Sequence, residues 1–318
     1  MCTYNGARYL DDQLASLAAQ TRAPDELIIC DDCSTDETVS HLKRFADEAP
    51  FPVRVQVNET TLGSTRNFAQ AIEQCHGDLI ALCDQDDIWN PEKLALTEQK
   101  FIENPKTSLV FTDADLVDEN AQSLNYTLWE SLRFDENLQK QIKGPGAFEL
   151  LNFRTLVTGA TMMFRAKFKE LVLPIPQTIP LIHDGWIALL ISLTGTLDII
   201  DRPQMKYRQH SKQQLGVPQK GQLPPPSGLV IDAQRRYDYK SEIQKLEAVY
   251  ERFEQTSPRY PVMAGANLDK RLHHLKHRVQ ISNQGLARIP GALDELLSGR
   301  YHQYSSGFKS FVKDLVRS

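Results

Sequence analysis

The sequence predicts an α/β fold, with a mostly parallel central sheet covered by helices on both faces and a helical C-terminal extension. Three observations carry this prediction. Short apolar runs alternate with segments of helical period over roughly the first 115 residues. Clusters of aspartate directly follow two of these runs. A segment rich in Pro, Gly and Gln then precedes a remainder whose apolar residues have helical spacing.

The first half of the chain supplies the alternating elements in order. We expect a helix at 10–18, a strand at 27–30, a helix at 39–46, a strand at 53–57, a helix at 68–75, a strand at 79–83, a helix from Pro91 and a strand at 108–112. Ser34 and Glu37 have the spacing of a capping box for the second helix. Asn90 with Pro91 has the pattern of an N-cap and first helical position. Elements that alternate in this way form βαβ units and a parallel sheet.

The second half is less regular and defines the domain boundaries. We expect a strand at 155–164, a proline-rich loop at 173–180, a buried helix at 184–193 and a last strand at "LDIID". The organisation that follows is a domain at 1–216, a Pro/Gly linker at 217–229 and a helical, basic region at 230–318.

Composition indicates a globular protein of a reducing compartment. The chain has 318 residues, of which 41% are hydrophobic, which is enough for a sizeable core. It contains no run of 18 or more apolar residues and no pattern of a signal peptide. Five scattered cysteines do not form the framework of a secreted disulfide-rich domain. We therefore expect a cytoplasmic protein.

Charge is distributed unevenly along the chain. Residues 270–318 hold nine Lys or Arg and three acids, a net charge of +6, which leaves −11 for the rest of a chain of net charge −5. This asymmetry predicts that the C-terminal end meets an anionic surface, although a solvated basic helix explains it equally well. The last segment places Phe308, Phe311, Val312 and Leu315 on one side, as in an interfacial helix or a docking helix.

The aspartate clusters predict a cation site. Asp84, Asp86 and Asp87 come just after the strand at 79–83, and a second acidic loop follows the strand at 27–30. Because ligands bind beyond the carboxyl ends of parallel strands, the two loops are expected to share one crevice. Clustered carboxylates are unfavourable when alone and favourable around a cation. Oxygen ligands select Mg²⁺ or Mn²⁺, whereas a solvated turn is the simpler alternative.

Three other patterns have plain structural explanations. The C-x-x-C at 30–33 has the spacing of a redox motif, but its two aspartates oppose the thiolate that such chemistry needs. Asp113 and Asp115 are expected in a turn that ends a strand. His273 and His277 have metal-ligand spacing on a helix, yet the interleaved Lys and Arg favour a solvated face.

Six motifs in a fixed order carry a resemblance to a known family. They are "TYNGARYLDDQLASLAAQT", "DDCSTDET", "DQDDIW", "TGATMMF", "HDGW" and "YRQHSKQQLG". Together they resemble the family 2 glycosyltransferases with the GT-A fold, in particular the bacterial rhamnosyltransferase-like branch that builds surface polysaccharide. The similarity covers about residues 1–216. It implies a nucleotide-sugar donor, a DxD motif, a divalent metal ion (Mg²⁺ or Mn²⁺) and inversion at the anomeric carbon.

The resemblance also implies roles for seven residues. These are nucleoside contact for Tyr4 and Asp32, ribose contact for Asp84, metal binding for Asp86 and His210, donor binding for Arg66, and general-base catalysis for Asp184. The acceptor is expected to be a saccharide, and a lipid-linked one would favour peripheral attachment of the basic C-terminus to the inner face of the cell membrane. No nucleic acid is expected as a partner.

Several alternatives stay open at this stage. The donor is expected to be dTDP-L-rhamnose, but a UDP-hexose would use the same aspartates. A nucleotidyltransferase is disfavoured because "TYNGARYL" lacks a phosphate loop rich in Gly and Lys. A catalytically inactive scaffold is the non-enzyme alternative. Only two residues precede "TYN", so most of a usual first strand is missing, and we expect a start further upstream or a truncated, destabilised chain.

Overall fold

The computed structural model describes residues 1–211, 213, 216–217, 239–256, 259–261, 268–282, 288–305 and 307–316. The chain divides into two compact units, Met1–Gln177 with Leu181–Leu223, and Thr178–Pro180 with Pro224–Ser318. The linker expected at 217–229 lies outside the described residues apart from Val217, so its boundaries stay a prediction.

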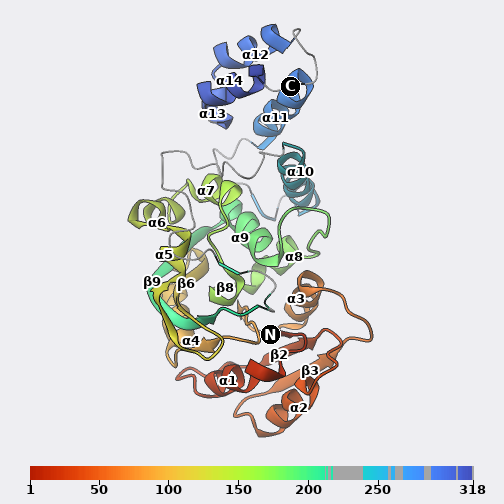
Figure 1. Cartoon of the computed structure of the whole chain (residues 1–318), viewed down its shortest axis with the longest axis vertical. Helices are drawn as coiled ribbons and strands as arrows, with labels where there is room; N and C mark the ends of the chain where they lie inside the picture. Colours follow the sequence, from red (N-terminus) through yellow and green to blue (C-terminus); the bar gives the residue numbers. More distant parts are fainter. Residues whose placement is uncertain are drawn as a thin grey trace. The chain divides into compact units, whose positions relative to one another are not determined.

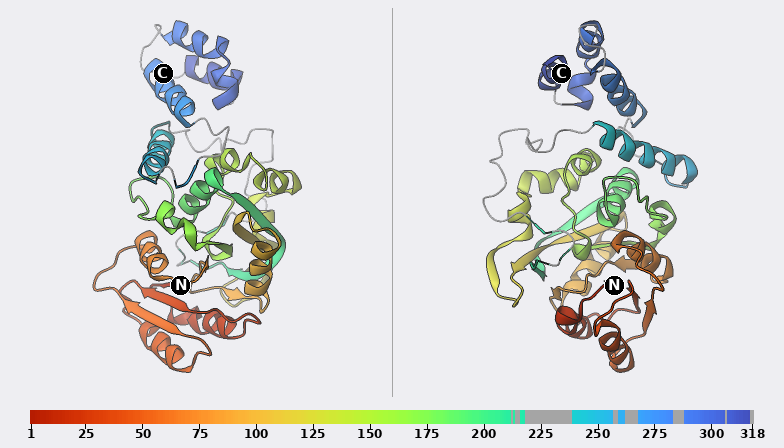
Figure 2. Two further views of the ribbon diagram at one scale, coloured as in Figure 1. Left: turned by 180° about the vertical axis from the view of Figure 1, so that it is seen from behind. Right: turned by 45° about the vertical axis from the view of Figure 1, so that its right-hand side comes forward.

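The first unit begins with a parallel sheet in the strand order β1-β2-β3 (Figure 1). Its strands are β1 (Cys2–Thr3), β2 (Leu27–Asp31) and β3 (Val53–Val57). Its helices are α1 (Ala7–Ala18), α2 (Thr38–Glu48) and α3 (Ser64–Gln74). The two views in Figure 2 place α2 and α3 on opposite sides of this sheet. The predicted βαβ pattern is therefore confirmed over β1, β2 and β3, whereas the strands expected at 79–83 and 108–112 belong to a second sheet.

The second sheet of this unit is mixed. Its six strands are β4 (Leu79–Ala81), β5 (Ile88–Trp89), β6 (Thr107–Val117), β7 (Ser123–Thr127), β8 (Met162–Arg165) and β9 (Thr196–Arg208). They follow the order β4-β8-β6-β9-β5, and β7 pairs with β6. Only β6 and β9 are parallel among these pairs. The Cys2 N–H donates to the Cys83 carbonyl (3.3 Å), so β1 continues towards the end of β4.

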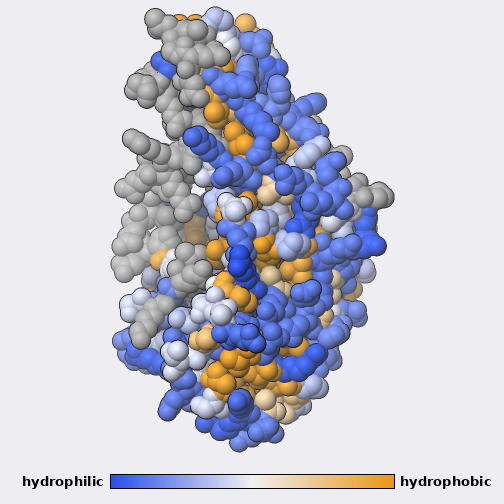
Figure 3. Space-filling model, turned by 90° about the vertical axis from the view of Figure 1, so that its right-hand side faces the viewer, coloured by the Kyte–Doolittle hydropathy of each residue, from blue (hydrophilic) through white to orange (hydrophobic). Residues whose placement is uncertain are grey.

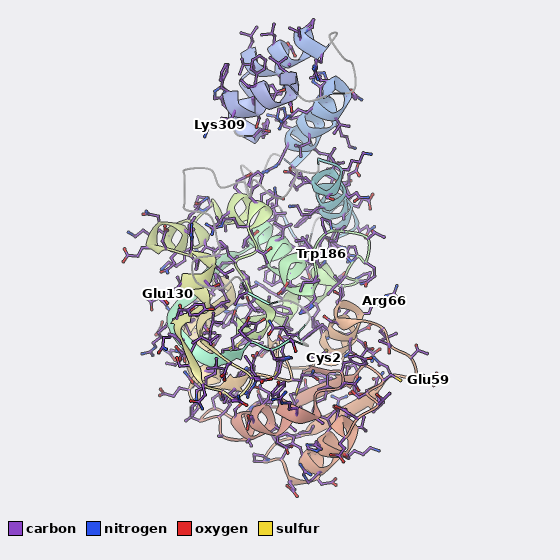
Figure 4. The ribbon with its side chains drawn as sticks, in the orientation of Figure 1. Cys2, Glu59, Arg66, Glu130, Trp186 and Lys309 are labelled. Carbon is purple, nitrogen blue, oxygen red and sulfur yellow. The ribbon has the colours of Figure 1, made fainter. Side chains whose placement is uncertain are left out.

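Short helices surround the second sheet. They are α4 (Lys93–Glu103), α5 (Leu128–Leu132), α6 (Glu136–Ile142), α7 (Ala147–Phe153), α8 (Lys169–Val172) and α9 (His183–Thr194). Helix α9 is buried over most of its length, and Trp186 in it donates through Nε1 to the Val172 carbonyl (2.9 Å; Figure 4). A short 3-10 helix, Gly159–Thr161, occupies the middle of the strand expected at 155–164. Of the residues expected in this strand, only those from Met162 onward belong to one, β8 (Met162–Arg165).

Two expected helix starts are wrong for local reasons. Helix α2 begins at Thr38 without the Ser34 cap, because the Ser34 hydroxyl donates to Asp31 Oδ2 (2.6 Å). Helix α4 begins at Lys93, two residues later than expected. Asn90 instead donates through Nδ2 to the Pro203 carbonyl (3.1 Å), which ties this turn to β9. At Asn90 a tertiary hydrogen bond competes successfully with the local cap, and at Ser34 a hydrogen bond within the same loop does so.

The second unit is helical in its described part. Its helices are α10 (Tyr239–Thr256), α11 (Leu268–Ser282), α12 (Arg288–Leu297), α13 (Arg300–Tyr304) and α14 (Phe308–Val316). Ile281, Ala292, Tyr301 and Phe311 form a small buried cluster. Phe311 thus faces inward and Leu315 packs against this cluster, as the docking-helix alternative expects, whereas Phe308 is exposed.

Part of the positive charge of the C-terminal region is internal. Arg271 and Arg278 are each 1% exposed and bind Glu242 and Asp314, respectively. Arg300 binds Glu295 through Nε (2.9 Å). These pairs were not predicted, because their members lie between 5 and 36 residues apart in sequence. They stabilise the helical unit from within rather than presenting charge to a partner.

On the face shown in Figure 3, the described residues expose mainly polar side chains, with several hydrophobic areas between them. None of the helices in the described part of the chain combines the length and the apolar character needed to cross a bilayer.

Candidate active site

The loop that follows β4 is held in place by the end of β9. Arg208, which is 3% exposed, donates through Nε to the Asp86 carbonyl (2.8 Å). Its backbone N–H donates to Asp87 Oδ1 (3.2 Å). Nε2 of His210 lies 2.8 Å from Asp86 Oδ2, in hydrogen-bonding contact. The structure therefore brings together Asp86 and His210, which are 124 residues apart in sequence, as the resemblance implied.

The charges of Asp84, Asp86, Asp87 and Asp184 act on one region, and the cation of Lys93 offsets them only in part. Burial, together with the charges of Asp86 and Asp184, raises the pKa of Asp84 to about 7. Burial and the charges of Asp86 and Asp84 raise the pKa of Asp87 well above its usual range. Burial raises the pKa of Tyr207 as well, together with the charges of Asp87, Asp84, Asp86 and Asp184. This arrangement favours the binding of a positively charged group.

Asp184 enters this region from the start of α9. Its Oδ2 accepts a hydrogen bond from the Gly159 N–H (3.1 Å) and its Oδ1 accepts one from the Gly185 N–H (2.6 Å). A side chain at Gly159 would place Cβ 3.1 Å from His183 Nε2 and 3.4 Å from Asp184 Cβ. Close backbone approach therefore explains the glycine in "TGAT". The neighbouring His183 stacks on Phe68, with ring centroids 4.0 Å apart.

The "TYN" segment is joined to the aspartate loop by Gln85. Gln85 Oε1 accepts from the Tyr4 N–H (2.8 Å), and its Nε2 donates to the Tyr4 carbonyl (3.1 Å). A side chain at Gly6 would place Cβ 2.2 Å from Gln85 Oε1, so glycine makes room for this clamp. The Tyr4 side chain is 51% exposed and free to meet a ligand. Gln85 was not predicted as a site residue, although it lies between Asp84 and Asp86 in the aspartate motif.

Asp31 and Asp32, at the end of β2, hold different segments of the chain. Asp31 accepts hydrogen bonds from Thr3 Oγ1 (2.7 Å) and from Ser34, which fixes the end of β1. Asp32 accepts from the backbone N–H groups of Leu62 (2.7 Å) and Gly63 (2.9 Å) and from an Asn58 amide. A carboxylate has about four acceptor sites. One site is therefore left on Asp32 for a further donor, and its contact with a nucleoside stays a prediction.

Arg66 is the predicted site residue that the structure does not join to this cluster. Its side chain is exposed on α3 (Figure 4) and has no hydrogen bond to the described residues. The role of Arg66 in donor binding stays a prediction.

A buried lysine that the sequence analysis missed lies behind the aspartate loop. Lys93 is 3% exposed, and its Nζ donates to the Ala160 carbonyl. Burial lowers the pKa of Lys93 to about 7, although Cys83, Asp87 and Asp84 oppose this shift. Its position at the start of an amphipathic helix gave no signal of burial.

The other patterns have structural roles. Asp113 lies within β6 rather than in a turn, and its Oδ1 accepts from the Trp129 N–H (2.9 Å). His277 binds Glu295 (2.7 Å), so it is not directed towards a metal ion with His273. The five cysteines are free thiols, and burial raises the pKa of Cys30, which disfavours a redox role for the C-x-x-C.

The residues of the crevice fit a hard divalent cation. In the described ranges no group of three or more His, Cys, Asp or Glu side chains is arranged to hold a metal ion. Mg²⁺ is, however, usually held by one or two carboxylates that are completed by phosphate oxygens and water. Asp86 with His210 supplies such a partial set, and the buried Oδ2 of Asp87 has no hydrogen-bond partner in the described structure.

Comparison with known proteins identifies the family. The family model described as "Glycosyl transferase family 2" matches residues 1–172, more than half of the chain. The chain belongs to this family. The resemblance found in the motifs and the GT-A fold that it implied are both confirmed.

Similar proteins include two curated relatives and one solved structure. An uncharacterized glycosyltransferase of Nostoc sp. is 26% identical over 65% of this chain and 62% of its own length. The dTDP-rhamnosyl transferase RfbG of Shigella flexneri is 28% identical over 68% of this chain and 74% of its own. TarS of S. aureus (residues 1–349) superposes with a TM-score of 0.57 at 17% identity, covering 99% of this chain and 80% of TarS. The chain thus spans less than two thirds of the Nostoc relative.

Proposed function

We propose that this chain is an inverting, metal-dependent glycosyltransferase that moves a sugar from a nucleotide-sugar donor to a saccharide acceptor during cell-surface polysaccharide synthesis. The observation that carries the proposal is the convergence of Asp84, Asp86, Asp184 and His210, from three separate segments, on one negatively charged region. We propose L-rhamnose carried by dTDP as the donor sugar. This choice is supported by the motifs and by the likeness to RfbG over 68% of the chain.

Asp86 and His210 would hold the metal ion together with the donor diphosphate. When bound, such an ion supplies Lewis-acid stabilisation of the negative charge that develops on the leaving diphosphate. Tyr4 and Asp32, which flank β1 and β2, would bind the nucleoside, and Asp84 would meet the ribose. Through its two hydrogen bonds to Tyr4, Gln85 joins the segment that would bind the nucleoside to the loop that would bind the metal ion.

Asp184 would accept the proton of the acceptor hydroxyl as that oxygen attacks the anomeric carbon. A sugar hydroxyl is a weak nucleophile, so removal of its proton in the transition state accelerates the reaction. The N–H groups of Gly159 and Gly185 orient both carboxylate oxygens of Asp184.

The first test is a thermal-shift screen with dTDP, UDP, GDP and CDP, each with and without Mn²⁺. A ligand that binds only the folded state raises the melting temperature. We expect stabilisation by dTDP that requires Mn²⁺ and is lost in Asp86→Ala. Asp47→Ala is a matched control, because Asp47 is an exposed aspartate on α2. Stabilisation by UDP instead would assign a UDP-hexose donor, and no response from folded protein would contradict the proposal.

We also propose that the protein is cytoplasmic and contacts the inner face of the membrane through its C-terminal unit. Support comes from exposed apolar residues on α12 and α14, among them Leu297 (85% exposed) and Phe308 (60% exposed). Lys309 beside them is exposed and suits anionic headgroups (Figure 4). Hydrophobic residues also reach the surface in the upper part of Figure 3, which belongs to this unit.

Sedimentation with phosphatidylcholine vesicles, with and without phosphatidylglycerol, tests the membrane contact. We expect the wild type to bind the anionic vesicles and the double variant Leu297→Asn, Phe308→Asn to lose binding at least fivefold. Ile102→Asn is the matched control, because Ile102 is a similarly exposed apolar residue (64%) on α4. A wild type that stays in the supernatant with both vesicles would refute the contact.

A further inference from the structure

We propose that Lys93 is a positioning residue, which holds the turn Gly159–Thr161 against the start of α9 and thereby sets the place of Asp184. The role assigned to Asp184 rests on the proposed function. The role of Lys93 in fixing the turn rests on contacts alone.

Burying the charged side chain of Lys93 costs free energy in these surroundings. The side chain is 3% exposed, and among the described residues Asp84 and Asp87 act on it only from beyond ion-pair distance. Its Nζ lies 3.7 Å from the centroid of the Trp89 ring and 3.4 Å from Met205 Sδ. Burial of an ammonium group without an ionic partner is strongly unfavourable. A methionine or leucine would fill this space at lower cost, so the amine serves some purpose beyond packing.

The group that the amine binds indicates this purpose. Nζ donates to the carbonyl of Ala160, the central residue of the turn. The residue before it, Gly159, donates its N–H to Asp184 Oδ2 (3.1 Å). A side chain at Gly159 would come within 3.1 Å of His183, so the turn and the start of α9 are already in close contact. A small rotation of the turn would therefore move the N–H that orients Asp184.

Lys93 also connects this turn to the other half of the site. It is the first residue of α4, and its cation lies over Trp89, two residues after Asp87. Met205, its other neighbour, precedes Tyr207 and Arg208 on β9. One buried amine thus joins the turn beside Asp184 to both segments that form the aspartate loop. A cation–π contact with Trp89 compensates part of the lost hydration.

The test compares Lys93→Met and Lys93→Gln with wild type in the full chain. Methionine keeps the apolar contacts but removes the donor and the charge, whereas glutamine keeps an N–H donor without the charge. Lys100→Met is the control, because Lys100 lies on the same helix at the surface, where it pairs with Asp198 (3.6 Å). Three quantities are measured: amide hydrogen exchange of residues 158–161, binding of dTDP or UDP with Mn²⁺, and turnover of the nucleotide sugar whose diphosphate binds.

For Lys93→Met we expect exchange at 158–161 to accelerate at least tenfold and kcat to fall at least tenfold. The donor KM and the affinity for the diphosphate should change less than twofold, because the donor-binding segments are intact. Lys93→Gln should recover most of both effects. Unchanged exchange in a folded Lys93→Met would overturn the proposal, as would a parallel loss of diphosphate binding.

Two further outcomes keep the test decisive. If Lys93→Met does not fold, Lys93→Gln carries the comparison, and wild-type exchange with wild-type kcat is then the expected result. Faster exchange in Lys93→Gln would show that the charge, and not the hydrogen bond, holds the turn, and would overturn the proposal. If the wild type binds no diphosphate, the proposed function fails, while the exchange rates still decide the role of Lys93.

Discussion

Buried acids of the crevice and of the helical unit have opposite surroundings. Around Asp84 and Asp87, burial and the charges of neighbouring carboxylates raise both pKa values, and Lys93 opposes this only in part. Around Glu295, burial also opposes ionisation, but hydrogen bonds from Arg300, His277 and His274 lower its pKa to about 2. The carboxylates near Asp84 and Asp87 repel one another, whereas the Glu295 carboxylate has hydrogen-bond donors within the fold.

This difference separates a binding site from a structural network. Asp314 of α14 accepts from Arg278 Nε (2.6 Å), from Arg278 Nη2 (2.9 Å) and from the Tyr301 hydroxyl (2.7 Å), so a further ligand would add little. In the aspartate loop, by contrast, the buried Oδ2 of Asp87 has no hydrogen-bond partner in the described structure, which leaves it available to a cation. Charges that a fold leaves uncompensated are characteristic of functional sites, whereas satisfied networks fix a packing arrangement.

The largest effect is expected from breaking the satisfied network. Arg278→Met leaves Asp314 buried without its cation, and removal of one member of a buried pair costs about 3–5 kcal/mol. We expect amide exchange in α11 and α14 to accelerate accordingly. Lys309→Met is the control, because exposed substitutions change stability by about 0.5 kcal/mol or less. Exchange equal to wild type in Arg278→Met would show that the network contributes nothing.

Acid should destabilise the helical unit by a smaller amount. The pKa of Glu295 is about 2 in the fold and about 4.3 when unfolded, so its contribution is complete above about pH 4.3 and is lost as pH falls towards 2. Burial lowers the pKa of His274, which acts in the same direction. We expect a loss of about 1–2 kcal/mol between pH 5 and pH 2, measured by urea unfolding. Glu295→Gln should flatten this dependence, and an equally steep one would contradict the assignment.

The sequence predicts the strands and the aspartate loop of the first unit more readily than the buried ion pairs of the helical unit. The apolar period was enough to predict β2 and β3, because this signal is local, whereas the crevice that the two acidic loops would share stays a prediction. Motif order was enough to pair Asp86 with His210. The partners of Arg271 and Arg278 were not predictable, because charged residues on a helix give no sign of burial when their partners lie 29 and 36 residues away.

The same limit explains the parts of the site that were missed. Lys93 follows "NPE" at the start of a helix, where a lysine is normally solvated, and its burial depends on β9 more than a hundred residues later. Arg208 is a similar case, since its contact with Asp86 joins positions 122 residues apart. Asn90 failed as an N-cap because a carbonyl of β9 offered it a better partner. In each case tertiary structure determined what a local pattern suggested differently.

The smallest effect, with the opposite sign, is expected in the crevice. The pKa of Asp84 is about 7 in the fold and about 3.9 when unfolded, so the folded state holds its proton longer, and wild-type stability falls as pH rises from about 4 to about 7. Asp84→Asn removes a charge that Lys93 offsets only in part. We therefore expect it to stabilise the protein by about 1 kcal/mol at pH 8 in the presence of EDTA, and by much less at pH 5.

Urea unfolding at the two pH values measures this gain, with Asp47→Asn as an exposed control on α2. The gain should disappear when Mn²⁺ and the diphosphate are added, because the wild type then receives the cation that its carboxylates lack, while the variant has less charge to offer. A variant that is less stable than wild type at pH 8 would mean that Asp84 is satisfied within the fold. The crevice would then resemble the helical unit, and the physical argument for a cation site would be lost.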